Sequence, residues 1–348
     1  MNIRPEMNPA KTRMRNHPLK GFSLLARASA AARRFLRRPA LLIAVSIPLL
    51  ILAGGGPSME DWPTRTTPES LPGQLLRPVP NEVQAGTAEP PGLPAPGDGR
   101  ESAVRARDGW IRFRIVTYNI HKGQGMDGAV LPSRIASVLN RLNPDIVALQ
   151  EVVGSGKGEG GQEEEIGNIL KMNSLLTPTR LLNGRAYGNA VLTRFPVESQ
   201  SCCDISQKNR EPRFCQRVDL LIEGRPVHVF NVHLGTSWKE REVQARQLVP
   251  FLSDPALKGP KILLGDFNEW FRGPATETLC KTFRSLDVQP FLTWPQTYPG
   301  FCPVFHIDHL YYKGDMKVAK VEAPRNWSTV IASDHMPLAV DLMIRAGG

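Results

Sequence analysis

The sequence has few cysteines, and none of them is spaced for metal binding. Its 348 residues contain five cysteines, with no CxxC pair among them: Cys202, Cys203, Cys215, Cys280 and Cys302. A thiolate zinc site is therefore not expected, and the missing HExxH pattern argues against a zinc hydrolase. If the chain is exported, one or two disulfides can form, and the alternative is that the cysteines are free buried thiols.

The C-terminal part of the chain also lacks a marked excess of basic residues. The net charge of the whole chain is +10, but residues 1–100 hold 13 Lys or Arg and 7 Asp or Glu, whereas residues 101–348 hold 30 and 26. The high isoelectric point is mostly a property of the N-terminal tail. It is therefore weak support for nucleic-acid binding by a folded domain.

A hydrophobic run long enough for a signal peptide or membrane segment is found only near the N-terminus. The run Ala40–Ala53 follows four arginines and is interrupted only by Ser46 and Pro48. This pattern indicates membrane targeting, and its length leaves a cleaved signal peptide and a signal anchor equally open. In either case the basic flank stays in the cytoplasm and the following residues are exported.

Composition divides the chain into four parts. Gly54–Arg100 holds ten Pro and eight Gly and too little apolar surface to offset its chain entropy. The predicted parts are a basic tail (1–39), a signal or anchor segment (40–56), a linker expected to be disordered (57–107) and a catalytic domain (108–348).

Short apolar runs alternate with turns in the predicted domain. Residues 111–120 alternate with period two, as in a strand. A helix is predicted from Ser133, its expected N-cap, to Asn143, before the strand 145–152, and another helix over 239–252. The glycine-rich segment Gly154–Gly161, together with the three glutamates Glu163–Glu165, is predicted to be a surface loop. Several strands are apolar throughout, which is typical of sheets covered on both faces and favours layered α/β packing.

Polar side chains stand at the ends of six of these apolar runs. The pairs are Asn119 and His121, Gln150 and Glu151, Asn231 and His233, Asp266 and Asn268, Asp308 and His309, and Asp334 and His335. One polar strand end is ordinary, whereas six of the same kind predict a single cleft. Carboxylate and amide oxygens suit a hard cation such as Mg²⁺ or Mn²⁺. A histidine oriented by a carboxylate can accept a proton from water, so the residue types fit metal-assisted phosphoester hydrolysis.

Seven motifs, in order, resemble the endonuclease/exonuclease/phosphatase superfamily over about residues 110–344. They are TYNIHKG, ALQEV, YGNAVLTRFPV, NVHLG, LLGDFN, TYPGFCPVFHIDHLYY and ASDHMPLAV. The resemblance implies an α/β four-layer sandwich, in which two face-to-face β-sheets are flanked by helices. The superfamily includes DNase I-like nucleases, sphingomyelinase-type phospholipases and inositol phosphatases.

The resemblance also implies roles for single residues. Glu151 would be the principal metal ligand, with Asn119 and Asp334 close to the ion. His335 would be the general base, oriented by Asp308. Asp266 and Asn268 would position water and phosphate, and His233 would act on the phosphate or the leaving group.

Other residues near these motifs have weaker assignments. Asn189 and Arg213 are predicted to bind substrate, although a turn and a solvated face are the structural alternatives, and Arg210 and Arg217 lie close by. His121 and His309 are expected to be structural or to support the ligands. His306 stands where an Arg is usual in the superfamily.

Together these observations predict a hydrolase of phosphodiester or phosphomonoester bonds that depends on Mg²⁺ or Mn²⁺. The expected enzyme is membrane-associated through residues 40–56, with its catalytic domain outside the cytoplasm, or secreted if that segment is cleaved. A phospholipid head group, an oligonucleotide or a small phosphodiester is the expected substrate, and no obligate protein partner is evident. The alternatives are a DNase-like endonuclease acting on duplex DNA and a non-catalytic binding module with the same fold.

Overall fold

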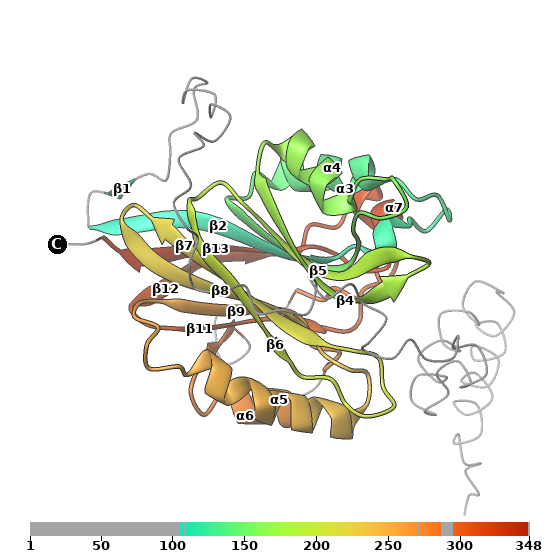
Figure 1. The fold of residues 1–348 in the computed structure, drawn as a ribbon. Coiled ribbons are helices and arrows are strands. Elements are labelled where there is room, and N and C mark those ends of the chain that lie inside the picture. The colour runs from blue at the N-terminus through green and yellow to red at the C-terminus, as the bar shows by residue number, and fades with distance from the viewer. Residues whose placement is uncertain (1–104, 107–108, 271, 287–294, 347–348) are drawn as a thin grey trace, which may run out of the picture. The chain divides into compact units, whose positions relative to one another are not determined.

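Two β-sheets pack face to face with helices on their outer faces (Figure 1). The computed structural model describes residues 105–106, 109–270, 272–286 and 295–346. The first sheet has the order β12 (Met316–Glu322), β13 (Leu338–Arg345), β2 (Trp110–Asn119), β3 (Ile146–Val153), β5 (Arg185–Thr193) and β4 (Asn173–Leu182), and β1 (Arg105–Ala106) pairs with β2. The second has the order β10 (Arg284–Ser285), β11 (Asp308–Lys313), β9 (Lys261–Asp266), β8 (Arg225–His233), β7 (Phe214–Ile222) and β6 (Val197–Asp204).

Three apolar layers hold the sheets and helices together. Successive strand residues point to opposite faces, so in β2 the side chains of Ile111, Phe113 and Ile115 pack between the sheets, while Val116 and Tyr118 pack against helices. The helices of the first sheet are η3 (His121–Gly123), α3 (Pro132–Leu142), α4 (Gln162–Leu170) and α7 (Trp327–Ala332), and those of the second are α5 (Trp238–Leu252) and α6 (Pro274–Leu279). The predicted four-layer sandwich is confirmed.

Each sheet contains one parallel strand pair joined by a helix. In the first sheet β2 and β3 are parallel and connected through α3, and in the second β8 and β9 are parallel and connected through α5. Parallel strands need such a crossover, and their carboxyl ends then meet at one edge. β13 and β11 run antiparallel to their neighbours, so the residues that precede these strands reach the same edge.

Most predicted elements are close to the observed ones, and two details were wrong. Ser133 is not the N-cap of α3, because Pro132 is already in its first turn and Leu131 is the N-cap. Proline suits this position because its φ is fixed and its missing N–H is not needed there. Asn143 ends the helix in the left-handed conformation, with φ of 47°, immediately before Pro144.

The three glutamates assigned to the glycine-rich loop instead form the first turn of α4. Carboxylates are stabilised near the positive end of a helix dipole. Glu164 also accepts a hydrogen bond of 3.0 Å from the backbone N–H of Gly161, the N-cap residue. The loop therefore ends at Gly161, and the following residues continue as a helix.

The N-terminal predictions fall almost entirely outside the described residues. The tail 1–39 and the segment 40–56 lie outside them, and of the linker 57–107 only β1 is described, where it pairs with β2. Among the helices in the described ranges, none has the length and apolar character needed to cross a membrane. All five cysteines are free thiols in the structure.

Candidate active site

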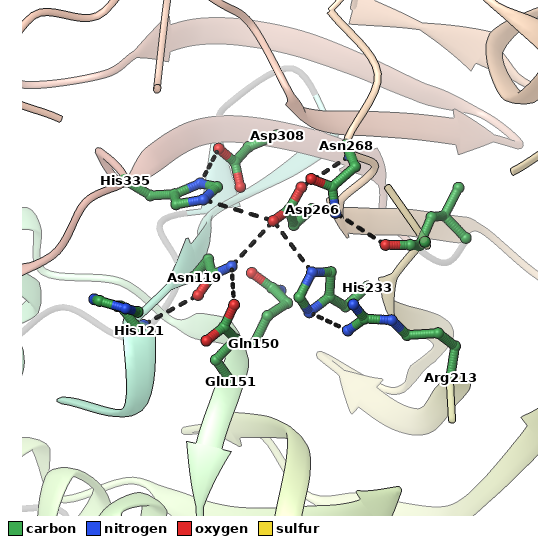
Figure 2. A network of polar contacts seen from close by, with 12 residues as sticks. Asn119, His121, Gln150, Glu151, Arg213, His233, Asp266, Asn268, Asp308 and His335 are labelled. Carbon is green, nitrogen blue, oxygen red and sulfur yellow. Dashed lines mark hydrogen bonds and ion pairs between the residues drawn. The ribbon is translucent and has the colours of Figure 1, made fainter. Parts of the chain in front are cut away.

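The polar strand ends gather at one edge of the two sheets. Asn119 ends β2, Glu151 lies near the end of β3, and His233 and Asp266 end β8 and β9. Asp308 begins β11 and is paired in register with Asp266, while His335 precedes β13. Figure 2 shows these side chains converging from both sheets on a common centre.

Asp266 lies at the centre of this group and is almost completely buried. Its Oδ2 atom accepts a hydrogen bond of 3.0 Å from Asn119 Nδ2, and it lies 3.4 Å from His233 Nε2 and 3.7 Å from His335 Nε2 (Figure 2). Burial raises the pKa of Asp266 to about 6, although the positive charge of His335 opposes this effect. One carboxylate oxygen thus faces nitrogen atoms from three different strand ends.

His335 and Asp308 form a buried pair beside Asp266. His335 Nδ1 lies 3.0 Å from Asp308 Oδ2, so the carboxylate fixes the orientation of the ring. Burial disfavours the charged ring, but the carboxylates of Asp308 and Asp266 outweigh it and raise the pKa of His335 to about 10. The ring of Tyr298 covers one side of the imidazole, with 5.0 Å between the ring centroids.

His233 has the opposite electrostatic setting. Arg213 Nη1 lies 2.8 Å from His233 Nδ1, and Arg213 also pairs with Glu211 at 2.9 Å. Burial and the positive charge of Arg213 keep the pKa of His233 well below its usual range. Since a guanidinium can only donate hydrogen bonds, Nδ1 accepts, and the proton of the neutral ring is on Nε2, which faces Asp266.

Glu151 is held in an unusual backbone conformation. Its φ is 58°, and the pairing of β3 with β5 shifts register between Leu149 and Val152. A left-handed non-glycine residue costs about 1–3 kcal/mol and is typical of functional sites. The bulge directs the carboxylate toward Asn119 Nδ2, at 3.3 Å, and Lys122 Nζ, at 2.9 Å.

The charge of Glu151 is stabilised by its neighbours. Burial by itself raises the pKa of this carboxyl, but the Lys122 ammonium and the Asn119 amide lower it below its usual range. His233 adds to the lowering only when its ring is protonated. Glu151 is therefore ionised at neutral pH and presents a carboxylate at the edge of the site.

A buried network of amides forms the floor of the site. Gln150 Nε2 donates to Asn231 Oδ1 at 2.8 Å, which joins β3 to β8. Asn231 Nδ2 in turn lies within 3.0 Å of the backbone carbonyl oxygens of Leu149 and Ala190. Since buried amides are costly unless satisfied, this network fixes the two sheets at one relative position beneath the site.

The residues present fit a divalent metal ion. Asp266, Asp308 and His335, which lie in the described part of the chain, offer donor atoms that are all within 4.8 Å of one another and could hold an ion. Asp308 Oδ1 is buried and has no hydrogen-bond partner in the described part of the chain. Together with Glu151 and Asn119 the site offers mainly oxygen donors, which hard cations prefer.

Of the remaining predicted residues, Asn268 contacts Asp266, Asp334 precedes His335 in the chain, and Asn189 lies on β5. Asn268 has φ of 50°, and its side chain donates to the Leu234 carbonyl at 2.9 Å, tying the ends of β8 and β9 together. Asp334 Oδ1 lies 3.9 Å from His121 Nδ1 and 3.4 Å from Ser333 Oγ. Asn189 is buried and donates to the Phe214 carbonyl at 3.2 Å, so it links the two sheets.

Of the two histidines predicted to be structural or supporting, His121 begins η3 after the first-sheet strand β2, and His309 lies in β11 of the second sheet. His309 Nε2 is 2.6 Å from the Glu269 carbonyl oxygen, and the ring of His306 packs edge-on against that of His309, with 4.5 Å between centroids. Among the substrate arginines, Arg213 contacts the site, whereas Arg217 lies over the ring of Phe251.

Three residues of the site were not predicted from the sequence. They are Lys122, which pairs with Glu151, Tyr298, which packs on His335, and Glu211, which pairs with Arg213. Lys122 lies inside the motif TYNIHKG and Tyr298 inside the motif TYPGFCPVFHIDHLYY, so both could have been predicted as site residues from their place in these motifs. Glu211 lies in the hairpin before β7 and carried no such signal.

Comparison with known proteins agrees with this architecture. The sequence profile described as the endonuclease/exonuclease/phosphatase family matches residues 116–335. The uncharacterized protein YbhP of Escherichia coli is 27% identical over 247 residues, which cover 66% of this chain and 96% of YbhP. A UPF0294 protein of Vibrio vulnificus is 30% identical over 128 residues, or 36% of this chain and 42% of that protein.

Solved structures share the fold. The endonuclease/exonuclease/phosphatase from Bacteroides vulgatus superposes with a TM-score of 0.57 at 17% identity, covering 67% of this chain and 99% of that one. A humanized D. rerio TDP2 superposes with a TM-score of 0.54 at 13% identity, covering 66% and 98%. At these identities the likeness concerns the fold alone.

Proposed function

Because this chain belongs to the endonuclease/exonuclease/phosphatase family, whose members are metal-dependent phosphoesterases, we propose that it hydrolyses phosphodiester or phosphomonoester bonds at the site described above. The observation that carries the proposal is the buried centre at Asp266, where one carboxylate oxygen faces Asn119, His233 and His335. A non-catalytic module would not need two histidines held in opposite charge states around one carboxylate.

Glu151, Asn119 and Asp334 would hold Mg²⁺ or Mn²⁺ in this proposal. Glu151 is ionised, and its left-handed backbone fixes the direction of its carboxylate, as expected for a metal ligand. The group of Asp266, Asp308 and His335 is the alternative place for the ion. When bound, a divalent cation supplies positive charge that neutralises the phosphate and lowers the pKa of the nearby His335 toward neutrality.

His335 is the proposed general base, and Asp308 is its positioning residue. The contact of 3.0 Å between His335 Nδ1 and Asp308 Oδ2 leaves Nε2 as the atom that faces the centre of the site. With a pKa of about 10 the ring is protonated at neutral pH. It can accept a proton from water only when its pKa is lowered, so base catalysis and cation binding are coupled.

His233 would donate from Nε2 to a phosphate or leaving-group oxygen. Its ring is neutral and its tautomer is fixed by Arg213, so it keeps an N–H directed into the site. Asn268 would keep Asp266 and the end of β8 in register through its contacts with Asp266 Oδ1 and the Leu234 carbonyl. Substrate binding by Asn189 and Arg213 stays a prediction, although the observed contacts of both are with the protein.

We also propose that the catalytic domain acts outside the cytoplasm and that residues 40–56 hold it at a membrane unless they are cleaved. The support is the sequence pattern of four arginines followed by Ala40–Ala53 and a Pro- and Gly-rich linker. A tethered phosphoesterase would meet lipid phosphodiesters and periplasmic oligonucleotides more often than long duplex DNA.

The direct test is a substrate screen of the purified full-length chain in detergent, with Mg²⁺ or with EDTA. The screen would include phospholipids, oligonucleotides, plasmid DNA, inositol phosphates and the soluble chromogen bis(p-nitrophenyl) phosphate. Cation-dependent hydrolysis of any of these supports the proposal. Salt-sensitive nicking of plasmid alone would identify a DNase-like enzyme, and no hydrolysis by any preparation would favour a binding module.

A further inference from the structure

We propose that an apolar rim beside the active site docks on the surface of an anionic phospholipid bilayer. The rim is defined as Met126, Val130, Leu131, Phe301, Val304 and Trp327. The part of the chain that the structure describes contains eight exposed large hydrophobic side chains, and six of them form this rim. The other two are Ile169 and Trp238. Single exposed apolar residues are ordinary, but such a concentration marks an interaction surface.

The rim comes from three segments: α7, which carries Trp327, and two segments that are hydrogen-bonded to residues 325–334, the stretch that contains α7 and leads into β13. The loop 124–131 is attached through the N–H of Met126, which donates to the Ile331 carbonyl of α7 at 3.0 Å. The hairpin 297–305 is attached through the N–H of Gly300, which donates to the Asp334 carbonyl at 2.6 Å. Arg325, which precedes α7, donates to the carbonyl of Phe301 at 2.9 Å. The three segments therefore border the same side of the site.

The rim lies close to the proposed chemistry. Tyr298, at the base of the hairpin that carries Phe301, packs on the ring of His335. Lys122, whose ammonium pairs with Glu151, lies just before the loop that carries Met126. A surface that covered the rim would consequently lie next to the metal-binding and base-catalytic side chains.

The charges of the rim favour a lipid surface. Segments 124–131, 297–305 and 327–332 contain one charged residue, Asp127, and it is paired with Arg134 at 2.8 Å. Arg141 and Arg325 are exposed beside α7, and among the described residues neither forms an ion pair with a carboxylate. Exposed tryptophan with adjacent arginine is typical of side chains at the interface of an anionic membrane.

The N-terminal part of the sequence would keep the rim close to a bilayer. The linker 57–107 separates the domain from the apolar segment 40–56. A flexible chain of that length has an end-to-end distance of about 40 Å, and a Pro-rich chain extends further. The rim can therefore reach the membrane to which that segment is proposed to attach the chain, whereas a partner protein has no comparable support.

Docking of the rim would select a lipid phosphodiester as substrate, and this step rests on the proposed function. With Trp327, Phe301 and Val304 in the interface, the site would lie at the depth of the head groups, where the phosphates are. Head-group specificity would then depend on the residues between the rim and Asp266, including Tyr298.

The test uses the full chain in vesicles of phosphatidylglycerol and brominated phosphatidylcholine, because bromine quenches tryptophan fluorescence at short range. Trp327 is 78% exposed and Trp238 is 56% exposed, so Trp327→Ala and Trp238→Ala form a matched pair. We expect Trp327→Ala to lose most of the quenchable signal and Trp238→Ala to retain it. Equal quenching in both variants would overturn the proposal, and so would self-association through the rim, detected by light scattering as dimers that Trp327→Ala abolishes.

A second measurement separates docking from catalysis. Trp327→Ala combined with Phe301→Ser should lower turnover of vesicle-borne phospholipid by about tenfold or more, a difference of ~1.4 kcal/mol, and leave hydrolysis of bis(p-nitrophenyl) phosphate unchanged. Equal loss on both substrates would overturn the docking role. If the unmodified chain hydrolyses neither compound, the proposed function fails, while the quenching result still decides whether the rim docks.

Discussion

Arg213 donates a hydrogen bond of 2.8 Å to His233 Nδ1 and so determines which nitrogen of that ring carries the proton. The guanidinium has no acceptor, and its other side pairs with Glu211 at 2.9 Å. With 8% of its surface exposed, Arg213 has little area left for a substrate. The contact therefore favours a positioning role over the predicted role in substrate binding.

Arg213→Met should lower kcat by on the order of tenfold to a hundredfold, because His233 would lose its fixed tautomer and its directed Nε2–H. KM should change little, whereas a substrate-binding role predicts the reverse. Nitrogen NMR of the His233 ring should show a mixture of tautomers in the variant. Arg217→Met, on β7 and paired with Asp219, is the control and should retain the rate of the unmodified protein.

Glu151→Gln should raise the Mg²⁺ concentration needed for half-maximal activity by roughly 10–100-fold or more, since a carboxylate ligand becomes a neutral amide of the same shape. The fold should persist because Lys122, the charge left without a partner, is 36% exposed and can be solvated. Titrations with Mg²⁺ and thermal melts check both statements. Glu198→Gln, on the exposed face of β6, serves as the control. Activity that EDTA leaves undiminished would refute a metal mechanism.

Replacement of the proposed base, His335→Ala, should reduce turnover by a factor of ~10²–10⁴. His335→Ala also leaves Asp308 without its partner. The variant Asp308→Asn keeps the His335 ring but removes the carboxylate that orients it, so its turnover measures what that orientation contributes. A near-normal rate with saturating substrate would mean that His335 has another role.

The charge of His335 should also appear as a dependence of stability on pH. In the folded protein its pKa is about 10, above the ordinary value of 6.5, because Asp308 and Asp266 outweigh the effect of burial. A group with a raised pKa stabilises the fold fully below its unfolded pKa and loses this effect as pH rises through the folded value. In EDTA, the Tm of the unmodified chain should therefore fall from about pH 7 to pH 10 more steeply than that of His335→Gln. Parallel curves would contradict the assignment.

The pattern of strand ends correctly predicted that polar residues from several strands meet at one site, although it did not identify Lys122, Tyr298 or Glu211. Asn119, Asp266, Asp308 and His335 converge because parallel strands place their carboxyl ends together and antiparallel neighbours begin at the same edge. The order of apolar runs and polar residues along the chain was thus sufficient to predict a layered fold and the residues at the centre of the site.

Contacts fixed by tertiary packing could not be predicted in this way. The left-handed backbone of Glu151 arises from a bulge against β5, and the contact between Arg213 and His233 joins residues on separate elements. The start of α4 was missed because glycines and acidic residues suit both a loop and a helix N-terminus. Alternation and spacing are local sequence signals. They therefore do not predict backbone conformations and side-chain contacts that depend on tertiary packing.

The proposed membrane orientation makes a prediction about the C-terminus. A reporter fused after Gly348 should be active on the outer side of the cytoplasmic membrane, because the arginines before Ala40 are retained in the cytoplasm. The mass of the mature chain would separate a cleaved signal from an anchor. Activity of the fusion only in the cytoplasm would exclude the proposed orientation.

Lys122 should compete with a metal ion for Glu151. Its ammonium lies 2.9 Å from Glu151 Oε2, so a divalent cation at that carboxylate would be repelled by it and would have to share the oxygen atoms. Lys122→Met removes the competing charge and keeps the length of the side chain. Because a partly exposed ion pair contributes no more than about 1 kcal/mol, the half-saturating metal concentration should fall by up to about fivefold.

Calorimetric titration with Mn²⁺ measures this concentration directly. The control is Lys239→Met, exposed on α5, which should bind Mn²⁺ as the unmodified chain does. Weaker Mn²⁺ binding by Lys122→Met would instead mean that the lysine orders Glu151 for the metal. That result would contradict the predicted competition between Lys122 and the ion.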